Sequence, residues 1–244
     1  MLPIPFLLSS LSTSAAGGWQ SSWGPEPPFW YDASTGNLTT NRGGSGSSYN
    51  LSGTTVNYGN TKNGLTVADM NGFLSVGNIY AFNSTHFFVF RYVNTSIFSV
   101  DYTANANQTG PGGGGNYNAG KFYFEARLSN RPYSDTVWSY TGTYPSETYP
   151  HVKSTHTSMT HSTWYVMSAT SDKDSGSNMT VWVNSTTQSN TTFTDSSYGS
   201  VLDDTLEIYS GTGNFLAEYI QYNSILSRAD VILVENYLKN KWGI

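Results

Sequence analysis

Aromatic side chains gather in one polar stretch of the sequence, at residues 133–149. An aromatic ring offers an apolar face for a sugar, and nearby amide or carboxylate groups can bind the sugar hydroxyls. The candidate glycan-binding residues are Tyr133, Asp135, Trp138, Tyr140, Tyr144 and Tyr149. The same rings could instead pack against the domain or against a neighbouring subunit, so both interpretations stay open.

The acidic residues do not form an evident catalytic pair. Glycoside hydrolysis usually needs two carboxyl groups about 5–9.5 Å apart across the scissile bond. Asp203, Asp204 and Glu207 form the tightest acidic cluster, but they surround the start of an expected strand, where a solvated edge explains them. The four histidines come without a nucleophile elbow. We therefore expect no catalytic residues and a protein that is not an enzyme.

Metal-binding patterns are equally weak. His151, His156 and His161 recur every five residues, a spacing that turns neighbouring side chains of a strand to opposite faces. Residues 172–176 partly match a calcium loop, but the match contains a lysine and lacks the final glutamate. We expect neither a metal site nor another cofactor, with calcium as the alternative kept open.

Composition excludes several classes of protein. The chain has 11 Lys+Arg against 16 Asp+Glu, a net charge of −5 and no basic run, which argues against nucleic-acid binding. It has no cysteine, which excludes disulfide frameworks and thiolate zinc sites. No apolar run reaches 18 residues, so no membrane span is expected.

The elements that must position these residues are mostly short strands. Apolar and aromatic runs are separated by turn signals every 8–15 residues, which is typical of an all-β antiparallel sandwich. Strands are expected near residues 30–34, 86–93, 96–102, 121–128, 136–140, 205–209 and 216–222. Residues 163–169 and 179–183 should pair as a hairpin, and residues 65–76 should form another around Asn71 and Gly72. Residues 35–63 are expected to be a surface loop.

Alternation within two of these strands assigns residues to faces. Ile97, Ser99 and Asp101 should share one face of their strand, opposite Phe98, Val100 and Tyr102. In the strand at residues 121–128, Tyr123, Glu125 and Arg127 should lie opposite Phe122, Phe124 and Ala126. Each strand therefore has one apolar face and one face of mixed polarity.

The last segment changes from a strand pattern to a helical one. Ser227 is a suitable N-cap, with the acid Asp230 three residues later. Val231, Val234, Leu238 and Trp242 then recur at helical spacing. We predict an amphipathic helix over residues 227–242 that packs on one end of the sandwich and buries Trp242.

The N-terminal region differs from the rest of the chain. Residues 1–11 are apolar, and residues 17–29 are rich in Gly, Pro and Trp. We interpret residues 1–28 as a docking arm with its linker and residues 29–244 as the sandwich with its helix. The arm should dock on its own domain or on a neighbouring subunit; a vestigial signal peptide is the alternative.

Three segments together suggest a family. They are residues 29–33 (FWYDA), the predicted hairpin at residues 163–184, and residues 214–244, which end in YL followed by KWGI. They resemble laminin-G-like, concanavalin-A-like jelly-roll domains of the kind found in phage virion proteins. The chain departs from that pattern at Ser185, where the family usually has glycine. The resemblance implies two packed antiparallel sheets but leaves function open, because this fold carries lectins, enzymes and structural modules.

Two functional hypotheses follow. The first is a non-catalytic virion structural protein, a capsid decoration or a tail- or fibre-associated subunit. It would display a lectin-like jelly roll on the particle surface for adhesion to host glycans. Its partners would be other virion proteins, bound through the arm, and further copies in a homo-oligomer. The second is a secreted, extracellular carbohydrate-binding module without a virion role.

Overall fold

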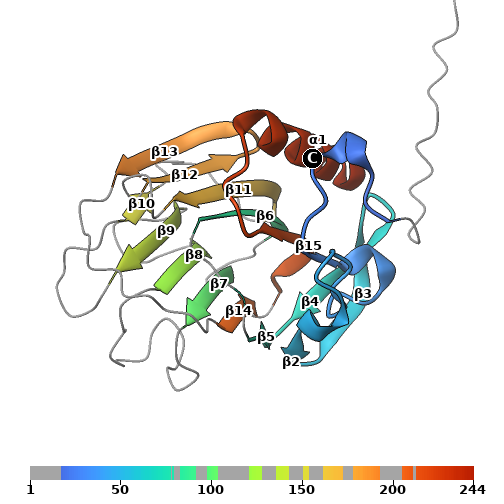
Figure 1. The fold of residues 1–244 in the computed structure, drawn as a ribbon. Helices are drawn as coiled ribbons and strands as arrows, with labels where there is room; N and C mark the ends of the chain where they lie inside the picture. The colour runs from blue at the N-terminus through green and yellow to red at the C-terminus, as the bar shows by residue number, and fades with distance from the viewer. Residues whose placement is uncertain are drawn as a thin grey trace, which may run out of the picture.

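A computed structural model describes residues 18–77, 79, 83–91, 98–103, 121–127, 136–142, 151–153, 162–172, 178–192, 205–210 and 213–244. Within these residues two antiparallel β-sheets pack face to face, and an α-helix lies outside them (Figure 1). The predicted fold class, an all-β sandwich with a C-terminal helix, is confirmed.

The first sheet has eight strands in the described part of the chain. They are β1 (Phe29–Asp32), β3 (Val56–Lys62), β4 (Leu65–Met70), β6 (Ser84–Arg91), β11 (Trp164–Asp172), β12 (Asn178–Val183), β13 (Thr186–Thr192) and β15 (Phe215–Tyr222). Their order is β13-β12-β11-β6-β15-β4-β3. β1 pairs with β15 beyond the end of β4, so β4 and β1 share one edge of β15 while β6 takes the other.

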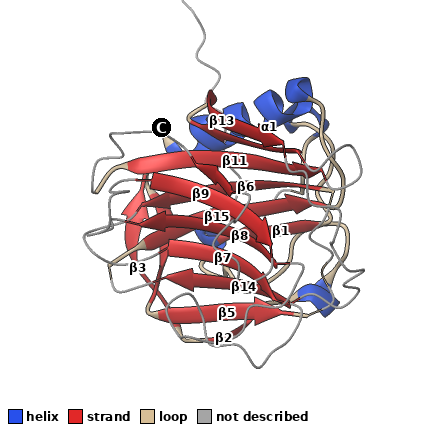
Figure 2. Ribbon diagram, turned by 90° about the vertical axis from the view of Figure 1, so that its left-hand side faces the viewer, coloured by secondary structure: helices blue, strands red, loops and turns tan. Residues whose placement is uncertain are grey.

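The second sheet has seven strands among the described residues. They are β2 (Ser52–Gly53), β5 (Gly72–Val76), β7 (Phe98–Thr103), β8 (Lys121–Arg127), β9 (Thr136–Gly142), β10 (His151–Lys153) and β14 (Thr205–Ser210). Their order is β10-β9-β8-β7-β14-β5-β2. Figure 2 shows β9, β8, β7, β14 and β5 running side by side.

Two hydrophobic clusters occupy the two faces of the eight-stranded sheet. The inner cluster lies between the sheets and includes Phe88, Phe90, Leu74, Ile208 and Tyr219. The outer cluster joins the sheet to the C-terminal helix and includes Phe87, Val89, Ile220, Val234 and Trp242. Successive residues of β6 therefore pack into opposite clusters, so this strand of mostly aromatic and β-branched residues is buried on both faces.

The predicted hairpin at residues 163–183 is confirmed. β11 and β12 pair antiparallel from Met167 opposite Val183 to Asp172 opposite Asn178. The expected hairpin around Asn71 and Gly72 is wrong. β4 belongs to the eight-stranded sheet and β5 to the seven-stranded sheet, so this dipeptide links the two sheets.

The β4 hairpin lies at the preceding Asn-Gly dipeptide instead. Asn63 (φ 52°) and Gly64 (φ 75°) both have positive φ, and Lys62 pairs with Leu65, as in a two-residue type I′ turn. The expectation of a simple surface loop over residues 35–63 is therefore wrong, because this stretch contains β2 and β3. β3 has no hydrophobic alternation that would predict a strand, because it is a polar edge strand with no buried residue.

Buried groups also hold the irregular part of residues 35–63 in place. Leu38 and Leu51 are buried in the inner cluster. The Asn41 side chain accepts hydrogen bonds from the backbone N–H of Trp30 and of Gly43. Its amide also donates to two backbone carbonyls, so Asn41 fixes this stretch against β1.

Helix α1 (Arg228–Trp242) begins as predicted. The Ser227 side chain accepts a hydrogen bond from the backbone N–H of Asp230, and Val231, Val234, Leu238 and Trp242 are all buried. The expected packing on one end of the sandwich is wrong. α1 lies across the outer face of the eight-stranded sheet, against β11 and β6, because its apolar stripe matches the outward residues of those strands.

The turn between β12 and β13 has a conformation that favours glycine. Asn184 (φ 49°) and Ser185 (φ 69°) both lie in the left-handed region. Asn184 tolerates it because its backbone and side chain both bond to Val166. Ser185 contacts Arg228 and Lys239 of α1 through its carbonyl and its hydroxyl.

Replacing Ser185 by glycine is expected to stabilise the domain by about 0.5–1 kcal/mol, because the left-handed strain exceeds the entropy cost of glycine. Urea unfolding of the wild type and of Ser185→Gly measures the difference. Asn63→Gly, in the other two-residue turn, is the control. The Asn63 side chain donates a hydrogen bond from Nδ2 to the Lys241 carbonyl, and glycine would lose this bond. Asn63→Gly should therefore stabilise the domain less than Ser185→Gly. A lower stability of Ser185→Gly would show that the contact with Lys239 dominates.

The described residues contain neither a membrane-spanning helix nor a cluster of metal-binding side chains. No helix in them is long and apolar enough to cross a membrane. No group of three or more His, Cys, Asp or Glu residues in the same ranges could hold a metal ion.

Candidate functional site

The predicted glycan-binding residues belong to, or flank, one strand of the seven-stranded sheet. Trp138 and Tyr140 lie in β9. Tyr133, Asp135, Tyr144 and Tyr149 lie outside the described residues. The structure therefore places two of the six predicted residues, two positions apart on one strand and hence on the same face.

The register of the sheet identifies that face. In β5, Leu74 is buried in the core whereas its neighbour Phe73 is 52% exposed. In β14, Leu206 and Ile208 are likewise buried in the core. Because strand residues alternate between faces, Phe73 marks the outer face, and each residue directly opposite it along the ladder shares that face.

Two rows of register positions cross this outer face. The first row contains Phe73, Tyr209, Ser99, Glu125, Trp138 and Lys153. The second contains Ser75, Glu207, Asp101, Tyr123, Tyr140 and His151. The predicted assignment of faces in the strands at residues 96–102 and 121–128 agrees with this register. The two rows combine aromatic residues with carboxylate and hydroxyl residues.

The inner positions of the same strands are different in kind. Val100 pairs with Phe124 and with Ile208, in the row that ends at the buried Leu74. These register positions are apolar, as expected of a row that ends at a core residue. On the outer face, Asp101 and Glu207 stand directly opposite each other. Like charges at directly opposed register positions of a sheet are generally destabilising.

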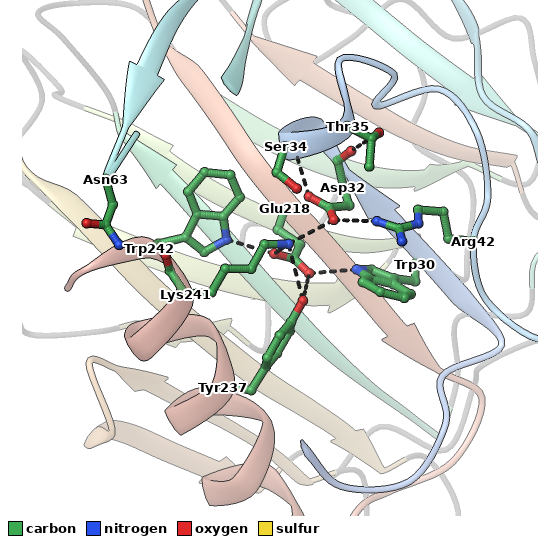
Figure 3. Close-up of polar contacts among 10 residues, drawn as sticks. All are labelled: Trp30, Asp32, Ser34, Thr35, Arg42, Asn63, Glu218, Tyr237, Lys241 and Trp242. Atoms are coloured by element: carbon green, nitrogen blue, oxygen red, sulfur yellow. Dashed lines mark hydrogen bonds and ion pairs between the residues drawn. The ribbon is translucent and has the colours of Figure 1, made fainter. Parts of the chain in front are cut away.

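A second group of polar residues is buried beneath α1 (Figure 3). Glu218 of β15 is completely buried, and its two oxygens accept four hydrogen bonds. The donors to Oε1 are Trp30 Nε1 at 2.6 Å and the Tyr237 hydroxyl at 2.8 Å. The donors to Oε2 are Trp242 Nε1 at 2.7 Å and Lys241 Nζ at 2.8 Å. We call Trp30, Asp32, Arg42, Glu218, Tyr237, Lys241 and Trp242 the carboxylate cluster.

A β-bulge brings Glu218 to this position. The register of β15 against β6 shifts between Leu216 and Glu218. Leu216 and Tyr219 belong to the inner cluster, and Ala217 belongs to the outer one. The extra residue puts both Ala217 and Glu218 on the outer face, so that the carboxylate meets the helix instead of the core.

Asp32 extends the cluster to the first strand. Its Oδ2 accepts from Arg42 at 2.6 Å and from Lys241 at 2.8 Å, and its Oδ1 accepts from the Ser34 backbone N–H. Lys241 thus bridges two buried carboxylates, and the two cations balance the two anions. The Arg42 guanidinium also stacks over Trp30, 4.2 Å from the ring centroid.

The carboxylate cluster joins β1, β15 and α1 and offers no accessible reactive group. Burial raises the pKa of Glu218, the Lys241 ammonium opposes this, and the Asp32 carboxylate adds to it. Burial, followed by the charge of Glu218, raises the pKa of Tyr237. Both carboxylates are almost completely buried and saturated with donors, so neither can reach a substrate.

A third polar group lies at one end of the inner core. His86 of β6 is fully buried, 2.6 Å from the Ser84 hydroxyl and 3.1 Å from the Tyr219 hydroxyl. Burial lowers the pKa of His86 to about 3. The imidazole therefore stays neutral in the folded protein at pH values where it becomes protonated in the unfolded chain.

This difference makes the domain sensitive to acid. The unfolded state takes up a proton at His86 below pH 6.5, whereas the folded state takes it up near pH 3, so stability falls as the pH is lowered between these values. We expect wild type to lose about 2–3 kcal/mol more than His86→Gln between pH 7.5 and 4.5. Urea unfolding of both proteins at both pH values measures this. Equal losses would contradict this account, because they would mean that His86 takes up its proton at the same pH in the folded and the unfolded state.

Comparison with known proteins identifies the fold but no family. No family model and no curated protein matches this chain. Domain 4 of the extracellular arabinanase AbnA from Geobacillus stearothermophilus, solved with arabinotriose, has 12% identity and a TM-score of 0.57, over 86% of this chain and 99% of that one. The carbohydrate recognition domain of Emp46p has 10% identity and a TM-score of 0.53, over 86% and 100%.

The binding domain of botulinum neurotoxin serotype D is also similar. A structure of it in complex with N-acetylneuraminic acid has 14% identity and a TM-score of 0.54. The alignment covers 87% of this chain and 51% of that one, so this chain spans about half of the toxin domain. At these identities the comparisons establish the fold: a lectin-like jelly-roll sandwich.

Proposed function

We propose that this chain is a non-catalytic, lectin-like module that binds glycans on the outer face of the seven-stranded sheet. The two rows of aromatic, carboxylate and hydroxyl residues across that face carry the proposal. Aromatic residues such as Trp138 and Tyr140 would stack on sugar rings, and Asp101 and Glu207 would accept hydrogen bonds from sugar hydroxyls. This role gives a reason for an acidic pair that a purely structural sheet would avoid.

The surroundings of the sheet favour this location. α1 packs on the outer face of the eight-stranded sheet, so that face is covered by the protein's own helix (Figure 1). Three structurally similar proteins support a sugar as the ligand: the arabinanase domain was solved with arabinotriose, the toxin domain with N-acetylneuraminic acid, and the Emp46p domain is named for carbohydrate recognition.

The setting that we propose is the surface of a virion, as a capsid decoration or a tail- or fibre-associated subunit. Residues 1–28 would attach the module to other virion proteins, within a homo-oligomer. Trp19 and Trp23 pack against Tyr237 of α1, so the chain leaves the described domain on the helix side. The attachment region and the glycan-binding sheet would then lie on opposite sides of the module. A secreted, extracellular carbohydrate-binding module is the alternative setting.

Substitution of Trp138 tests the glycan-binding face. On a glycan array we expect the wild type to bind and Trp138→Ala to bind about ten- to thirtyfold more weakly, as for the loss of a central aromatic contact. Tyr140→Ala should weaken binding in the same direction. Ile232→Ala, on the exposed surface of α1, is the matched control and should bind like the wild type. Unchanged binding by a correctly folded Trp138→Ala protein would contradict this location.

Incubation with the bound polysaccharide tests the non-catalytic part of the proposal. No new reducing ends are expected. Asp101 and Glu207 are the first carboxylates to test for hydrolysis, because they occupy directly opposed positions of neighbouring strands. Turnover that disappears in Glu207→Gln and in Asp101→Asn would overturn the non-catalytic assignment, as would turnover that depends on Asp203 or Asp204.

Mass spectrometry of purified particles tests the setting. A virion protein should occur there in a fixed ratio to a capsid or tail protein, and deletion of residues 1–18 should prevent its incorporation while leaving the sandwich folded. Recovery of the chain solely as a free extracellular protein would favour the secreted alternative.

A further inference from the structure

Helix α1 has an unusual distribution of charge. Surface helices normally direct their charged residues to water. Here all five charged residues of the helix contact other groups of the protein. Arg228 pairs with Glu235, Asp230 bonds to Ser227, Lys239 bonds to Ser185, and Lys241 bridges Asp32 and Glu218.

The most exposed positions of the helix carry no charged residue, although the side chain of Arg228 beside them is itself 37% exposed. These positions, at helical spacing, are Ala229, Ile232, Leu233, Asn236 and Asn240. Ile232 is 40% exposed and Leu233 is 42% exposed, and both are among the few large apolar side chains that the described residues leave open to solvent. We call these five residues the outer stripe. An apolar and amide stripe of this kind is suited to contact with another uncharged segment.

The chain has such a segment next to the outer stripe. Residues 1–11 are predominantly apolar, and the first charged residue of the whole sequence is Glu26. Residues just after this segment are fixed beside the helix: the Trp19 ring lies 5.2 Å from that of Tyr237, and Trp23 stacks on Tyr237 at 4.3 Å. Gly24 adjoins Leu233 so closely that an added Cβ would lie 3.8 Å from the Leu233 Cβ.

Chain length allows the segment to return onto its own helix. Residues 12–18 can span at most about 25 Å. A helix of the length of α1 measures about 22 Å, so residues 1–11 can reach any part of the outer stripe. A second copy is a poorer occupant, because a stable dimer interface needs roughly 20–30 residues on each side and the stripe has five.

We infer that residues 1–11 of the same chain dock on the outer stripe of α1 and cover Ile232 and Leu233. The contact is intramolecular, and tethering gives it a high effective concentration without a new partner. The docked segment and the helix would then together form the surface by which the module attaches to other virion proteins. The inference does not depend on glycan binding, so the failure of one leaves the other intact.

The absence of cysteine from the natural sequence permits a direct test. Leu233→Cys introduces one thiol on the outer stripe, and Ser52→Cys introduces one at an exposed position of β2 as the matched control. The rate of maleimide labelling is measured in the full chain and in chains that also carry Leu7→Glu and Leu8→Glu, which make the segment polar without shortening it.

We expect Leu233→Cys to label roughly tenfold more slowly with the natural segment than with the polar one, as for a site that reacts after local opening. Ser52→Cys should label equally in both. The protection should stay the same when the protein is diluted below about 1 μM, a concentration at which a weak dimer dissociates. Equal rates for Leu233→Cys would overturn the inference. Protection lost on dilution would also overturn it, by assigning the stripe to a second copy.

Discussion

Replacement of Trp242 by alanine is expected to lower the free energy of unfolding by about 3–5 kcal/mol, the range for truncation of a large buried aromatic residue. Trp242 is fully buried in the outer cluster, where it joins α1 to the eight-stranded sheet. Its Nε1 also donates to Glu218 Oε2 at 2.7 Å, so the substitution removes one of the four donors to a buried carboxylate. Urea or guanidinium unfolding, followed by circular dichroism, measures the loss.

Two further variants separate the sources of this effect. Trp242→Phe keeps an aromatic ring but removes the N–H donor, so it should cost less than Trp242→Ala. Ile225→Ala, at a 39% exposed position just before the helix, should change stability by under about 1 kcal/mol. Unaltered unfolding of Trp242→Ala would show that α1 is an attachment that does not stabilise the sandwich.

Replacement of Lys241 by methionine is expected to cost about 3–5 kcal/mol at neutral pH, as for a buried ion pair that loses one partner. Methionine fills much of the same space, so the effect arises chiefly from charge. The variant leaves Asp32 and Glu218 buried with a single cation among the described residues, Arg42, which pairs with Asp32 and not with Glu218. Lys239→Met is the matched control on the same helix, because the Lys239 ammonium bonds to the half-buried Ser185 hydroxyl and not to a buried carboxylate.

The pH dependence of Lys241→Met gives a second readout. Burial raises the pKa of Glu218, and Lys241 holds that rise back. Without Lys241 the pKa should rise further. A carboxyl group with a raised pKa stabilises the folded state below its unfolded pKa and loses that contribution as pH rises through the folded pKa. The deficit of Lys241→Met relative to the wild type should therefore shrink between pH 7.5 and 5. An equal deficit at both values would contradict the role of Lys241 as counter-ion.

Local pattern was sufficient to predict most strands and the helix. Alternation predicted the strand Lys121–Arg127. Helical spacing from Val231 to Trp242 reflects one buried face, and the structure shows that face of the helix buried. Local sequence pattern did not predict which strands pair with one another. Asn71 and Gly72 form a good turn dipeptide, yet the strands on either side join different sheets. The polar strand β3 gave no signal because its pairing with β4, not its burial, makes it a strand.

The candidate site shows the same division. Alternation assigned Ser99, Asp101, Tyr123 and Glu125 to mixed faces, and the register then assembled those faces into two rows. The carboxylate cluster could not be predicted, because its members are up to about two hundred residues apart and a bulge at Ala217 reorients Glu218. The Trp-x-Asp and Lys-Trp signatures at the two ends were the available signal, and they meet through Lys241.

Hydrogen exchange of the protein with the glycan that binds it best on the array tests the central claim most directly. Bound glycan should slow exchange in peptides that cover β8, β9 and β14, whose residues form the two rows of the outer face. Exchange in the peptide that covers α1, on the opposite sheet, should not change. Slower exchange confined to α1 and β15, or no change anywhere in the chain at saturating glycan, would contradict glycan binding on the seven-stranded sheet.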